Sequence, residues 1–359
     1  MSDYDIRQYR PNDRAGFLSL YRTVMGGERG DDWFDWKYEE NPYTDHVSMI
    51  VGVSEGEIVG ARPLFALPLA VDGACEIALQ PGDTMVHPEH RRQGLFTRMT
   101  ERAIERYAED HPFFFNFPND QSLPGYLKLG WEVVSRRSSY YRIENLEKIA
   151  ESRNSGDAIR LISKIATPVA RGYYGFRDRT ISPAADRTVR AESDTPAEEL
   201  SALYRTAVPD AVHALRDDQF YRWRLENPDW EYTTYIADRE TGPVAAIVAG
   251  TSVGQNPTTT KLSDVVPLVS APEPALESLI GRILTDHPET DLFVAPSQGI
   301  PEAVLRKFGF RSDTAFPLSF LTSRTTHVVR RLAGDRERDE RAVSDPERWL
   351  MTFLEEDTS

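Results

Sequence analysis

The sequence is poor in cysteine and in long apolar runs. Cys75 is its only cysteine, so no disulfide can form within the chain, and nothing argues for an oxidising compartment. No run approaches the roughly 20 apolar residues that a membrane-spanning helix needs, and the first residues lack the apolar region of a secretory signal. We therefore expect a soluble, cytoplasmic protein that has no membrane partner.

Positive charge is also scarce. The formal net charge is −15 at pH 7, which argues against the basic face of a general nucleic-acid binder. Lysine occurs at only six positions, although lysine and arginine together number 42. Two explanations of this acidic, arginine-rich composition stay open: an acidic surface suited to a high-salt cytoplasm, or a genome rich in arginine codons.

The 359 residues suit about two domains, and an internal repeat supports that number. Four segments of the first part return in the same order after residue 189. They are Ser19–Thr23 as Ala202–Thr206, Phe34–Pro42 as Tyr221–Pro228, Asp110–Pro112 as Asp286–Pro288, and Lys128–Trp131 as Lys307–Phe310. Such a repeat indicates two copies of one domain. Features present in both copies are expected to serve the fold, and features present in one copy are candidates for chemistry.

The repeat and the composition predict the division of the chain. We expect a catalytic domain over residues 1–143, a partly helical connector over 144–188, a second domain over 189–330 and a charged tail over 331–359. The connector is expected to be helical over Ala158–Ala170. In the tail, Asp345-Pro346 is a good helix start, and a short amphipathic helix is expected to carry its apolar side chains on one face: Trp349, Leu350, Phe353 and Leu354.

The stretch from Asp83 to Arg106 carries the clearest functional signal. A short apolar strand, Thr84–Val86, ends before Pro88, and the apolar spacing from Thr97 onward is that of a helix. The loop between them enters the helix at a glycine. Backbone N–H groups and the helix dipole at such a place favour an anion such as a phosphate.

This stretch resembles the acetyl-CoA pyrophosphate loop of the GNAT superfamily of N-acetyltransferases. Val86, Pro88, Arg91 and Gly94 match the family's pattern. Arg92 departs from it where a glycine is frequent, and Phe96 where glycine or alanine is usual, so the Phe96 side chain must point away from the phosphates. The resemblance implies that the cofactor is bound by Met85, Val86, Arg91, Arg92, Gln93, Gly94, Phe96 and Thr97.

A second GNAT motif follows. Asn119 and, seven positions later, Tyr126 precede Leu129-Gly130-Trp131. The resemblance implies that Asn119 contacts the cofactor and that the Tyr126 hydroxyl lies near the thioester sulfur. The second copy has Ser297 and Leu305 at these places, and it is five residues shorter where the phosphate loop should be.

The overall plan resembles the tandem GNAT proteins of the enhanced-intracellular-survival type, without their C-terminal sterol-carrier-like domain. The implied fold class is α/β with mixed sheets: two tandem GNAT-like domains, the second degenerate. The resemblance implies an N-acetyltransferase with acetyl-CoA as cosubstrate and no metal, acting on a small-molecule or peptide amine in a ternary complex.

The resemblance also implies roles for particular residues. Tyr126 would protonate the leaving thiolate, and the backbone N–H groups at Met85 and Val86 would stabilise the oxyanion. Asp83 is the nearest candidate base, with Glu76, His87 or a water chain as alternatives. The acceptor pocket is expected to be walled by Trp33, Trp36 and Tyr38.

The sequence leaves two other functions and the oligomeric state open. A FemAB-like aminoacyl transferase is the other enzyme class, and the intact phosphate loop argues against it. A non-catalytic CoA-binding sensor or scaffold is the non-enzyme alternative. Neither a monomer nor a homo-oligomer is favoured by the sequence.

Overall fold

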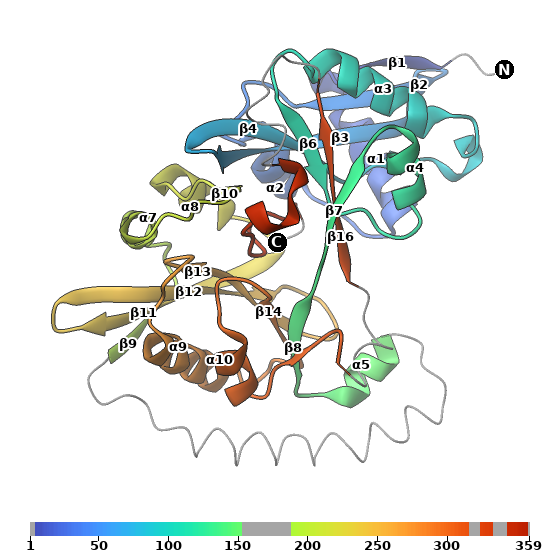
Figure 1. Cartoon of the computed structure of the whole chain (residues 1–359). Helices are drawn as coiled ribbons and strands as arrows, with labels where there is room; N and C mark the ends of the chain where they lie inside the picture. Colours follow the sequence, from blue (N-terminus) through green and yellow to red (C-terminus); the bar gives the residue numbers. More distant parts are fainter. Residues whose placement is uncertain (1–3, 153–187, 316–323, 333–342, 358–359) are drawn as a thin grey trace.

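A computed structural model describes residues 4–152, 188–315, 324–332 and 343–357. These residues form two lobes, each built on a mixed β-sheet, and Figure 1 shows one lobe above the other. The helix expected over 158–170 lies outside the described residues. Within the described ranges, no helix has both the length and the apolar character required to cross a membrane.

The first sheet has nine strands among the described residues. Its order is β1-β2-β3-β4-β6-β16-β7, and the short strands β5 and β10 each pair with β3. The strand bounds are β1 Asp5–Gln8, β2 Met49–Ser54, β3 Glu57–Val71, β4 Ala74–Pro81, β5 Met85–Val86, β6 Phe113–Asn116, β7 Glu132–Arg137, β10 His213–Ala214 and β16 Thr325–Arg331. Glu55 and Gly56 form the turn between β2 and β3, where both residues have positive φ.

The second sheet has seven strands in the order β15-β8-β14-β13-β12-β11-β9. Their bounds are β8 Ser139–Ile143, β9 Thr188–Glu192, β11 Trp230–Arg239, β12 Gly242–Ser252, β13 Thr259–Val266, β14 Leu292–Pro296 and β15 Arg311–Ser312. Each sheet contains one parallel pair at equivalent places of the repeat, β4 with β6 and β13 with β14. The predicted fold class, two tandem α/β domains with mixed sheets, is thus confirmed.

The helices cover the sheets in a repeated arrangement. In the first copy they are α1 Arg14–Met25, α2 Asp31–Phe34 continued by η2 Asp35–Glu39, α3 Leu95–Tyr107 and α4 Leu123–Lys128; in the second copy they are α7 Ala197–Thr206, α8 Asp218–Arg224, α9 Glu273–Asp286 and α10 Glu302–Lys307. The remaining helical elements are η1 Pro11–Asp13, η3 Pro88–His90, α5 Leu146–Ser152 and η5 Pro346–Arg348.

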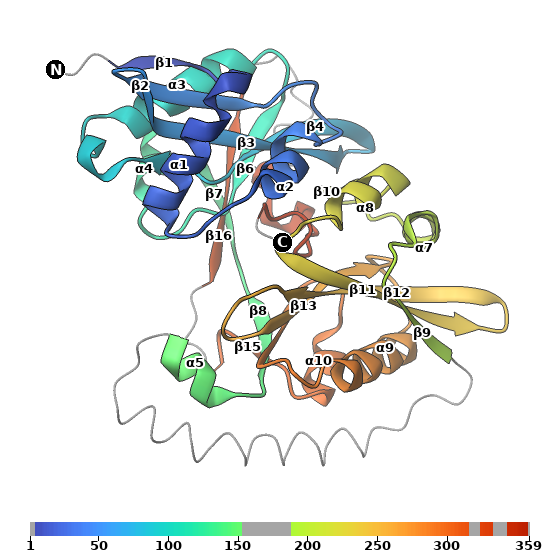
Figure 2. The same cartoon turned by 180° about the vertical axis from the view of Figure 1, so that it is seen from behind.

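The faces of the two sheets that point toward each other share one hydrophobic core. Side chains of α1, α2, α7 and α8 meet in this core with residues of both sheets. The outer face of the first sheet packs against α3 and α4, and the outer face of the second packs against α9 and α10. Figure 2 shows α1 and α2 on the side nearer the viewer and α3 behind them. The lobes are therefore joined through a continuous apolar interior.

The two sheets exchange one strand each. β8 follows β7 in the chain, yet it pairs between β14 and β15 in the second sheet. In return β16, which ends the second copy, pairs between β6 and β7 in the first sheet. Figure 1 shows β7 and β8 running from one lobe into the other. The predicted domain boundaries at residues 143, 188 and 330 stay a prediction. In the structure, each sheet is completed by a strand from the other copy of the repeat.

The repeated tryptophans meet at the centre of the molecule. Nε1 of Trp36 donates to the carbonyl oxygen of Trp223 at 2.8 Å, and Nε1 of Trp223 donates to the carbonyl oxygen of Trp36 at 2.8 Å. Their rings are stacked with centroids 6.3 Å apart. This reciprocal pair relates the copies by an approximate two-fold axis, and it explains why the element occurs in both.

The C-terminal segment differs from the predicted amphipathic helix. From Asp345 to residue 357, which the structure describes, Pro346–Arg348 is the one helical part, as a 3-10 turn, and residues 349–357 form turns and an extended piece. This segment lies between the lobes (Figure 1), where Trp349, Met351 and Leu354 are buried. Its apolar side chains are covered from several sides rather than from one, which removes the advantage of a helix with a single apolar face.

Candidate active site

The predicted phosphate loop forms a tight turn that leads into α3. After η3, Arg92 has a φ of 62° and Gly94 a φ of 79°, and α3 begins at the next residue. A left-handed conformation is costly for arginine, which explains why related loops use glycine at that position. In the part of the chain that the structure describes, no protein acceptor is paired with the backbone N–H groups of residues 92–94. These donors are available to an anion at the start of a 13-residue helix.

The loop is held from the side by a residue that sequence reasoning missed. The Tyr4 hydroxyl donates to Oε1 of Gln93 at 2.9 Å and lies 2.9 Å from Nδ1 of His90. Arg98, in the first turns of α3, donates to the carbonyl oxygen of Tyr4 at 3.0 Å. The Gln93 side chain therefore anchors the loop, and its backbone N–H remains exposed to solvent.

The charged side chains of the loop face solvent. Arg91, Arg92 and Thr97 are exposed. The Nε atom of Arg91 donates to the carbonyl oxygen of Val86 at 3.3 Å, which folds this side chain back toward the end of β5. The predicted cofactor residues of the loop are therefore collected on one solvent-facing turn.

Phe96 occupies the position where glycine or alanine is usual, and its ring turns toward α4. The ring centroid lies 5.6 Å from that of Tyr126, with the planes at 79°. Gly125 makes room for it, because a Cβ atom there would lie 2.9 Å from Cε1 of Phe96. The expectation that Phe96 points away from the phosphates agrees with this packing, and Gly125 is the compensating small residue.

Tyr126 is buried, with 3% of its surface exposed, and its hydroxyl oxygen accepts two hydrogen bonds. Nδ2 of Asn116 donates to it at 2.7 Å, and Nη1 of Arg62 donates to it at 3.2 Å. Neither donor was identified from the sequence. Asn116 ends β6 and Arg62 lies on β3, so three separate elements meet at this oxygen.

The structure places Asn119 apart from Tyr126. Its side chain is exposed, and Oδ1 accepts from the backbone N–H groups of Gln121 and Ser122 at 3.1 and 2.9 Å. Asn119 thus shapes the turn that precedes α4. Asn116, three positions earlier, makes the contact with the tyrosine, and the role of Asn119 in cofactor binding stays a prediction.

The first sheet is open beside Met85 and Val86. β5 pairs with β3 through Ala61 and Gly60, and β6 pairs with β4 at one position, Leu79 with Phe114. Within the described residues, no backbone pairing joins β5 to β6. The polar groups on the free edge of β5 therefore face the place where these two strands separate.

Asp83, the candidate base, belongs to a buried ionic cluster. Its Oδ2 atom accepts from Nζ of Lys37 at 2.6 Å and from the Tyr38 hydroxyl at 2.8 Å. Lys37 also donates to Asp357 of the C-terminal segment at 3.2 Å. Burial raises the pKa of Tyr38 well above its usual value, so the phenol stays protonated and donates. Burial lowers the pKa of Lys37, but the charges of Asp83 and Asp357 outweigh that effect and raise it.

The three predicted acceptor-wall residues are all buried. Trp33, Trp36 and Tyr38 expose 4%, 3% and 2% of their surface. The Trp36 side chain donates its hydrogen bond to the other copy, and the Tyr38 hydroxyl donates to Asp83. Their predicted role in binding an acceptor is not visible in this arrangement and stays a prediction.

The second copy has no counterpart of this loop. The chain passes from β13 through Pro272 into α9, and Glu273 is the first helical residue. Leu305, at the place of Tyr126, is completely buried in the core under α9 and α10. Asp264, the counterpart of Asp83, forms a buried ion pair with Arg216. The acidic residue therefore recurs in both copies, whereas the loop and the tyrosine occur in one.

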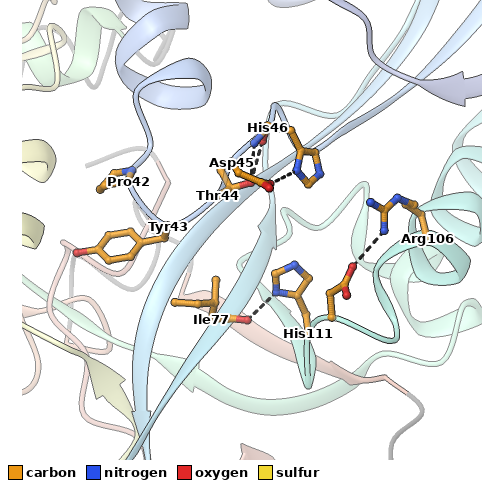
Figure 3. A pocket seen from close by; sticks show the side chains of 9 residues that line it. Pro42, Tyr43, Thr44, Asp45, His46, Ile77, Arg106 and His111 are labelled. Carbon is orange, nitrogen blue, oxygen red and sulfur yellow. Dashed lines mark hydrogen bonds and ion pairs between the residues drawn. The ribbon is translucent and has the colours of Figure 1, made fainter.

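A separate pocket of about 710 Å³ lies near the C-terminal end of α3, opposite the end that carries the loop. Figure 3 shows its lining side chains: Pro42, Tyr43, Thr44, Asp45, His46, Ile77, Arg106, Asp110 and His111. Nδ1 of His111 bonds the carbonyl oxygen of Ile77 at 2.9 Å, and burial lowers the pKa of this histidine. Nothing in the described residues forms a metal-binding group of three or more His, Cys, Asp or Glu side chains.

Comparisons with known proteins agree with this description. Residues 5–134 match the family model of the acetyltransferase (GNAT) domain. A GCN5-related N-acetyltransferase from Anabaena variabilis shares the fold over 92% of this chain and 73% of its own, with 12% identity and a TM-score of 0.61. A protein from Enterococcus faecalis described as a probable N-acyltransferase has the same coverage, 11% identity and a TM-score of 0.64.

Eis1 from Mycobacterium abscessus is also similar, over 91% of this chain and 74% of its own, with 15% identity and a TM-score of 0.53. No curated protein matches the sequence. The predicted resemblance to GNAT proteins, including one of the enhanced-intracellular-survival type, is confirmed at the level of the fold. Residues 5–134 thus match the GNAT acetyltransferase domain, and the chain as a whole has the fold of these GNAT proteins.

Proposed function

We propose that the protein is an N-acetyltransferase that transfers the acetyl group of acetyl-CoA to a primary amine in a ternary complex. One observation carries this proposal. The unpaired N–H groups of residues 92–94 stand at the start of α3, and the hydroxyl of Tyr126 lies under Phe96, in the first turn of the same helix. A pyrophosphate bound by the loop would direct the thioester toward the opening between β5 and β6.

The reaction needs an oxyanion donor and a proton for the leaving sulfur. Met85 pairs with Ala61 of β3, so the free edge of β5 offers the backbone N–H of Val86 next to the opening, where preorganised dipoles stabilise developing charge. Tyr126 supplies the proton, because its oxygen already accepts two hydrogen bonds and its own hydrogen is left to point elsewhere.

The proton of the acceptor amine leaves on the opposite side of the sheet. Tyr38, which binds Asp83, belongs to the core between the lobes, whereas Tyr126 belongs to the core under α3 and α4. The amine would therefore lie on the Asp83 side of the first sheet, and the cofactor on the α3 side. Asp83 is a base in this proposal only when Lys37 releases it, because the ion pair at 2.6 Å occupies the carboxylate.

The acceptor is assigned only by class, as a small-molecule or peptide amine. The second lobe faces the side on which Asp83 lies, and it would form part of the acceptor's surroundings. Two of the similar proteins are described as a GCN5-related N-acetyltransferase and a probable N-acyltransferase, and they support transfer of an acyl group to nitrogen here.

Two measurements test the proposal. Calorimetry with acetyl-CoA should show binding at micromolar concentrations, and desulfo-CoA, which keeps the pyrophosphate, should bind as a control. A thiol-release assay against polyamines, aminoglycosides and peptide amines should then show turnover. Absence of binding would overturn the GNAT function. Binding without turnover of any amine would favour a CoA-binding sensor, for which the occupied Asp83 is the structural argument.

A further inference from the structure

Arg62 is a completely buried arginine without a carboxylate partner. It exposes 0% of its surface. Its Nη1 atom donates to the hydroxyls of Thr84 and Tyr126 at 3.1 and 3.2 Å, and its Nε and Nη2 atoms have no hydrogen-bond partner. Burial lowers the pKa of Arg62. A buried charge with two unsatisfied donors weakens the fold, so the fold alone does not account for this residue.

Two of the other buried arginines of the described residues have a carboxylate partner, and the third, Arg224, has two carbonyl acceptors although its Nη1 atom lacks a partner. Arg216 pairs with Asp264 and Glu355, Arg142 pairs with Glu144, and Arg224 donates to the carbonyl oxygens of Leu354 and Glu356. The guanidinium of Arg62 instead lies among aromatic rings, 5.0 Å from the centroid of Phe96 and 4.9 Å from that of Tyr126. Its positive charge therefore acts on Tyr126 more than on any other polar group.

We propose that Arg62 is a positioning residue that makes Tyr126 an effective proton donor. The inference rests on the proposed acetyl transfer and adds a residue to it. Arg62 and Asn116 both donate to the hydroxyl oxygen, so the hydroxyl hydrogen takes the remaining direction. The rings of Phe96 and Trp131 pack edge to face against the ring of Tyr126, with centroids 5.6 and 5.1 Å from its centroid, and fix the orientation of the tyrosine ring.

The charge of Arg62 acts when the proton leaves. In the transfer, the amine nitrogen forms a bond to the acetyl carbon, the carbon–sulfur bond breaks, and its electron pair stays on sulfur. Tyr126 gives its proton to that sulfur and becomes a phenolate beside the guanidinium, which has no other counter-ion. The proton lost by the amine later restores the phenol through solvent. Stabilisation of this transient ion pair in a buried site lowers the barrier for the proton transfer.

The test is a double-mutant cycle with Arg62→Met and Tyr126→Phe in the full chain, using acetyl-CoA and an amine that the wild type acetylates. Arg62→Met should lower kcat by about 10- to 100-fold, the worth of one charge-assisted hydrogen bond. KM for acetyl-CoA should change less than threefold, and the melting temperature should not fall. In the Tyr126→Phe background, Arg62→Met should have no further effect on kcat. In the otherwise wild-type chain, Arg62→Lys should keep part of the rate that Arg62→Met loses.

Controls separate this role from a structural one. Arg142→Met removes another buried arginine, distant from the reaction; it should lower the melting temperature and leave kcat unchanged. If Arg62→Met does not fold, Arg62→Gln, which keeps a donor without the charge, should show the same loss of kcat. An equal loss from Arg62→Met in the wild-type and the Tyr126→Phe backgrounds would overturn the proposal, as would an unchanged kcat in the single variant. A wild type that acetylates no amine would overturn the proposed function together with this role.

Discussion

The hydroxyl of Tyr126 is the single atom on which the proposed chemistry depends most. Tyr126→Phe removes it and keeps the ring between Phe96 and Trp131. We expect kcat to fall by roughly 10²–10⁴, the usual contribution of a positioned acid, and the affinity for acetyl-CoA to stay nearly the same. Steady-state kinetics and calorimetry measure the two quantities.

A matched variant makes this result specific. Tyr235 is another buried tyrosine, on β11 of the second lobe, and its hydroxyl lies 3.1 Å from Nε2 of His287. Tyr235→Phe should leave kcat unchanged. If Tyr126→Phe also keeps the wild-type rate, Tyr126 serves packing alone and another group must protonate the sulfur.

At the scale of residues, the sequence predicted the side chains that lie in motifs and missed those that meet them in space. Tyr126 and Gly94 are predicted site residues because their spacing along the chain matches a known pattern, and their roles stay predictions. Arg62 and Asn116 lie on β3 and β6, where alternate residues face opposite sides of the sheet, and a sequence does not tell which side until the strand register is known. Asn119 was chosen for the cofactor because of its spacing, whereas its side chain caps the turn before α4.

At the scale of elements, the phosphate loop should determine cofactor affinity. Arg91→Ala together with Gly94→Asp removes a positive charge and places a carboxylate where φ is 79° and phosphates are expected. Both changes oppose an anion at the helix start, so calorimetry should detect no acetyl-CoA binding. Arg102→Ala is the control, because Arg102 lies further along α3 in an exposed pair with Glu105. Wild-type affinity in the double variant would place the pyrophosphate elsewhere.

Glu355 is the buried carboxylate that ties the C-terminal segment to the rest of the chain. Its carboxylate lies 2.9 Å from Nη2 of Arg216 and accepts from the backbone N–H groups of Ala214 and Thr352 at 3.1 and 2.8 Å. Burial alone would raise the pKa of Glu355, but Arg216 and these N–H groups outweigh it and lower the pKa. A lowered pKa stabilises the fold above the ordinary value of 4.5, and this contribution disappears as the pH falls through the folded-state pKa.

Glu355→Gln should therefore lower the free energy of unfolding at neutral pH, and the loss should be smaller at acidic pH. Loss of one partner of a buried ion pair costs about 3–5 kcal/mol. Denaturant unfolding at pH 7 should show that loss, and the difference from wild type should shrink when the pH is taken below the ordinary glutamate pKa of 4.5. Glu105→Gln, in the exposed pair on α3, should change little at either pH. A difference that stays constant down to about pH 3 would show that the charge of Glu355 is not what holds the segment.

The elements themselves were predicted better than their pairing. The short strand that ends at Val86 and the helix after Gly94 formed as expected, because each has a local apolar pattern and a clear turn signal. The exchange of β8 and β16 has no such signal. The two strands occupy equivalent places in the repeat, so a sequence pattern fits pairing within one copy as well as pairing across copies. The tail helix failed because burial between the lobes outweighs local spacing.

At the scale of the molecule, the copies should differ in what they bind. The first has the loop with free N–H groups, and the second has Pro272 and Glu273 at the start of α9. Proline removes a donor and glutamate adds a like charge, so we expect the second copy not to bind a pyrophosphate. Calorimetric titration should give one acetyl-CoA per chain. A stoichiometry of two would contradict the assignment of the second copy as degenerate.

The strand exchange makes the first lobe dependent on the rest of the chain. A shortened chain ending after Ile143 contains the loop and Tyr126 but lacks β16, which pairs with both β6 and β7 in the intact sheet. Without it those two strands keep unpaired edges, and the core between the lobes loses the side chains of α7 and α8. The shortened chain should therefore show a reduced, non-cooperative unfolding transition by circular dichroism and no binding of acetyl-CoA.

Complementation distinguishes this cause from a general loss of stability. A second polypeptide covering residues 189–359 supplies β16 to the first sheet. Its own sheet requires β8, and the first polypeptide retains that strand. The two pieces should therefore combine when they are expressed together, co-elute in gel filtration and recover acetyl-CoA binding. Removal of residues 324–332 from the second piece should abolish that recovery, because β16 is then missing again. Full activity of the shortened chain alone would show that the first lobe completes its sheet without β16, and that the exchange is not required for the site.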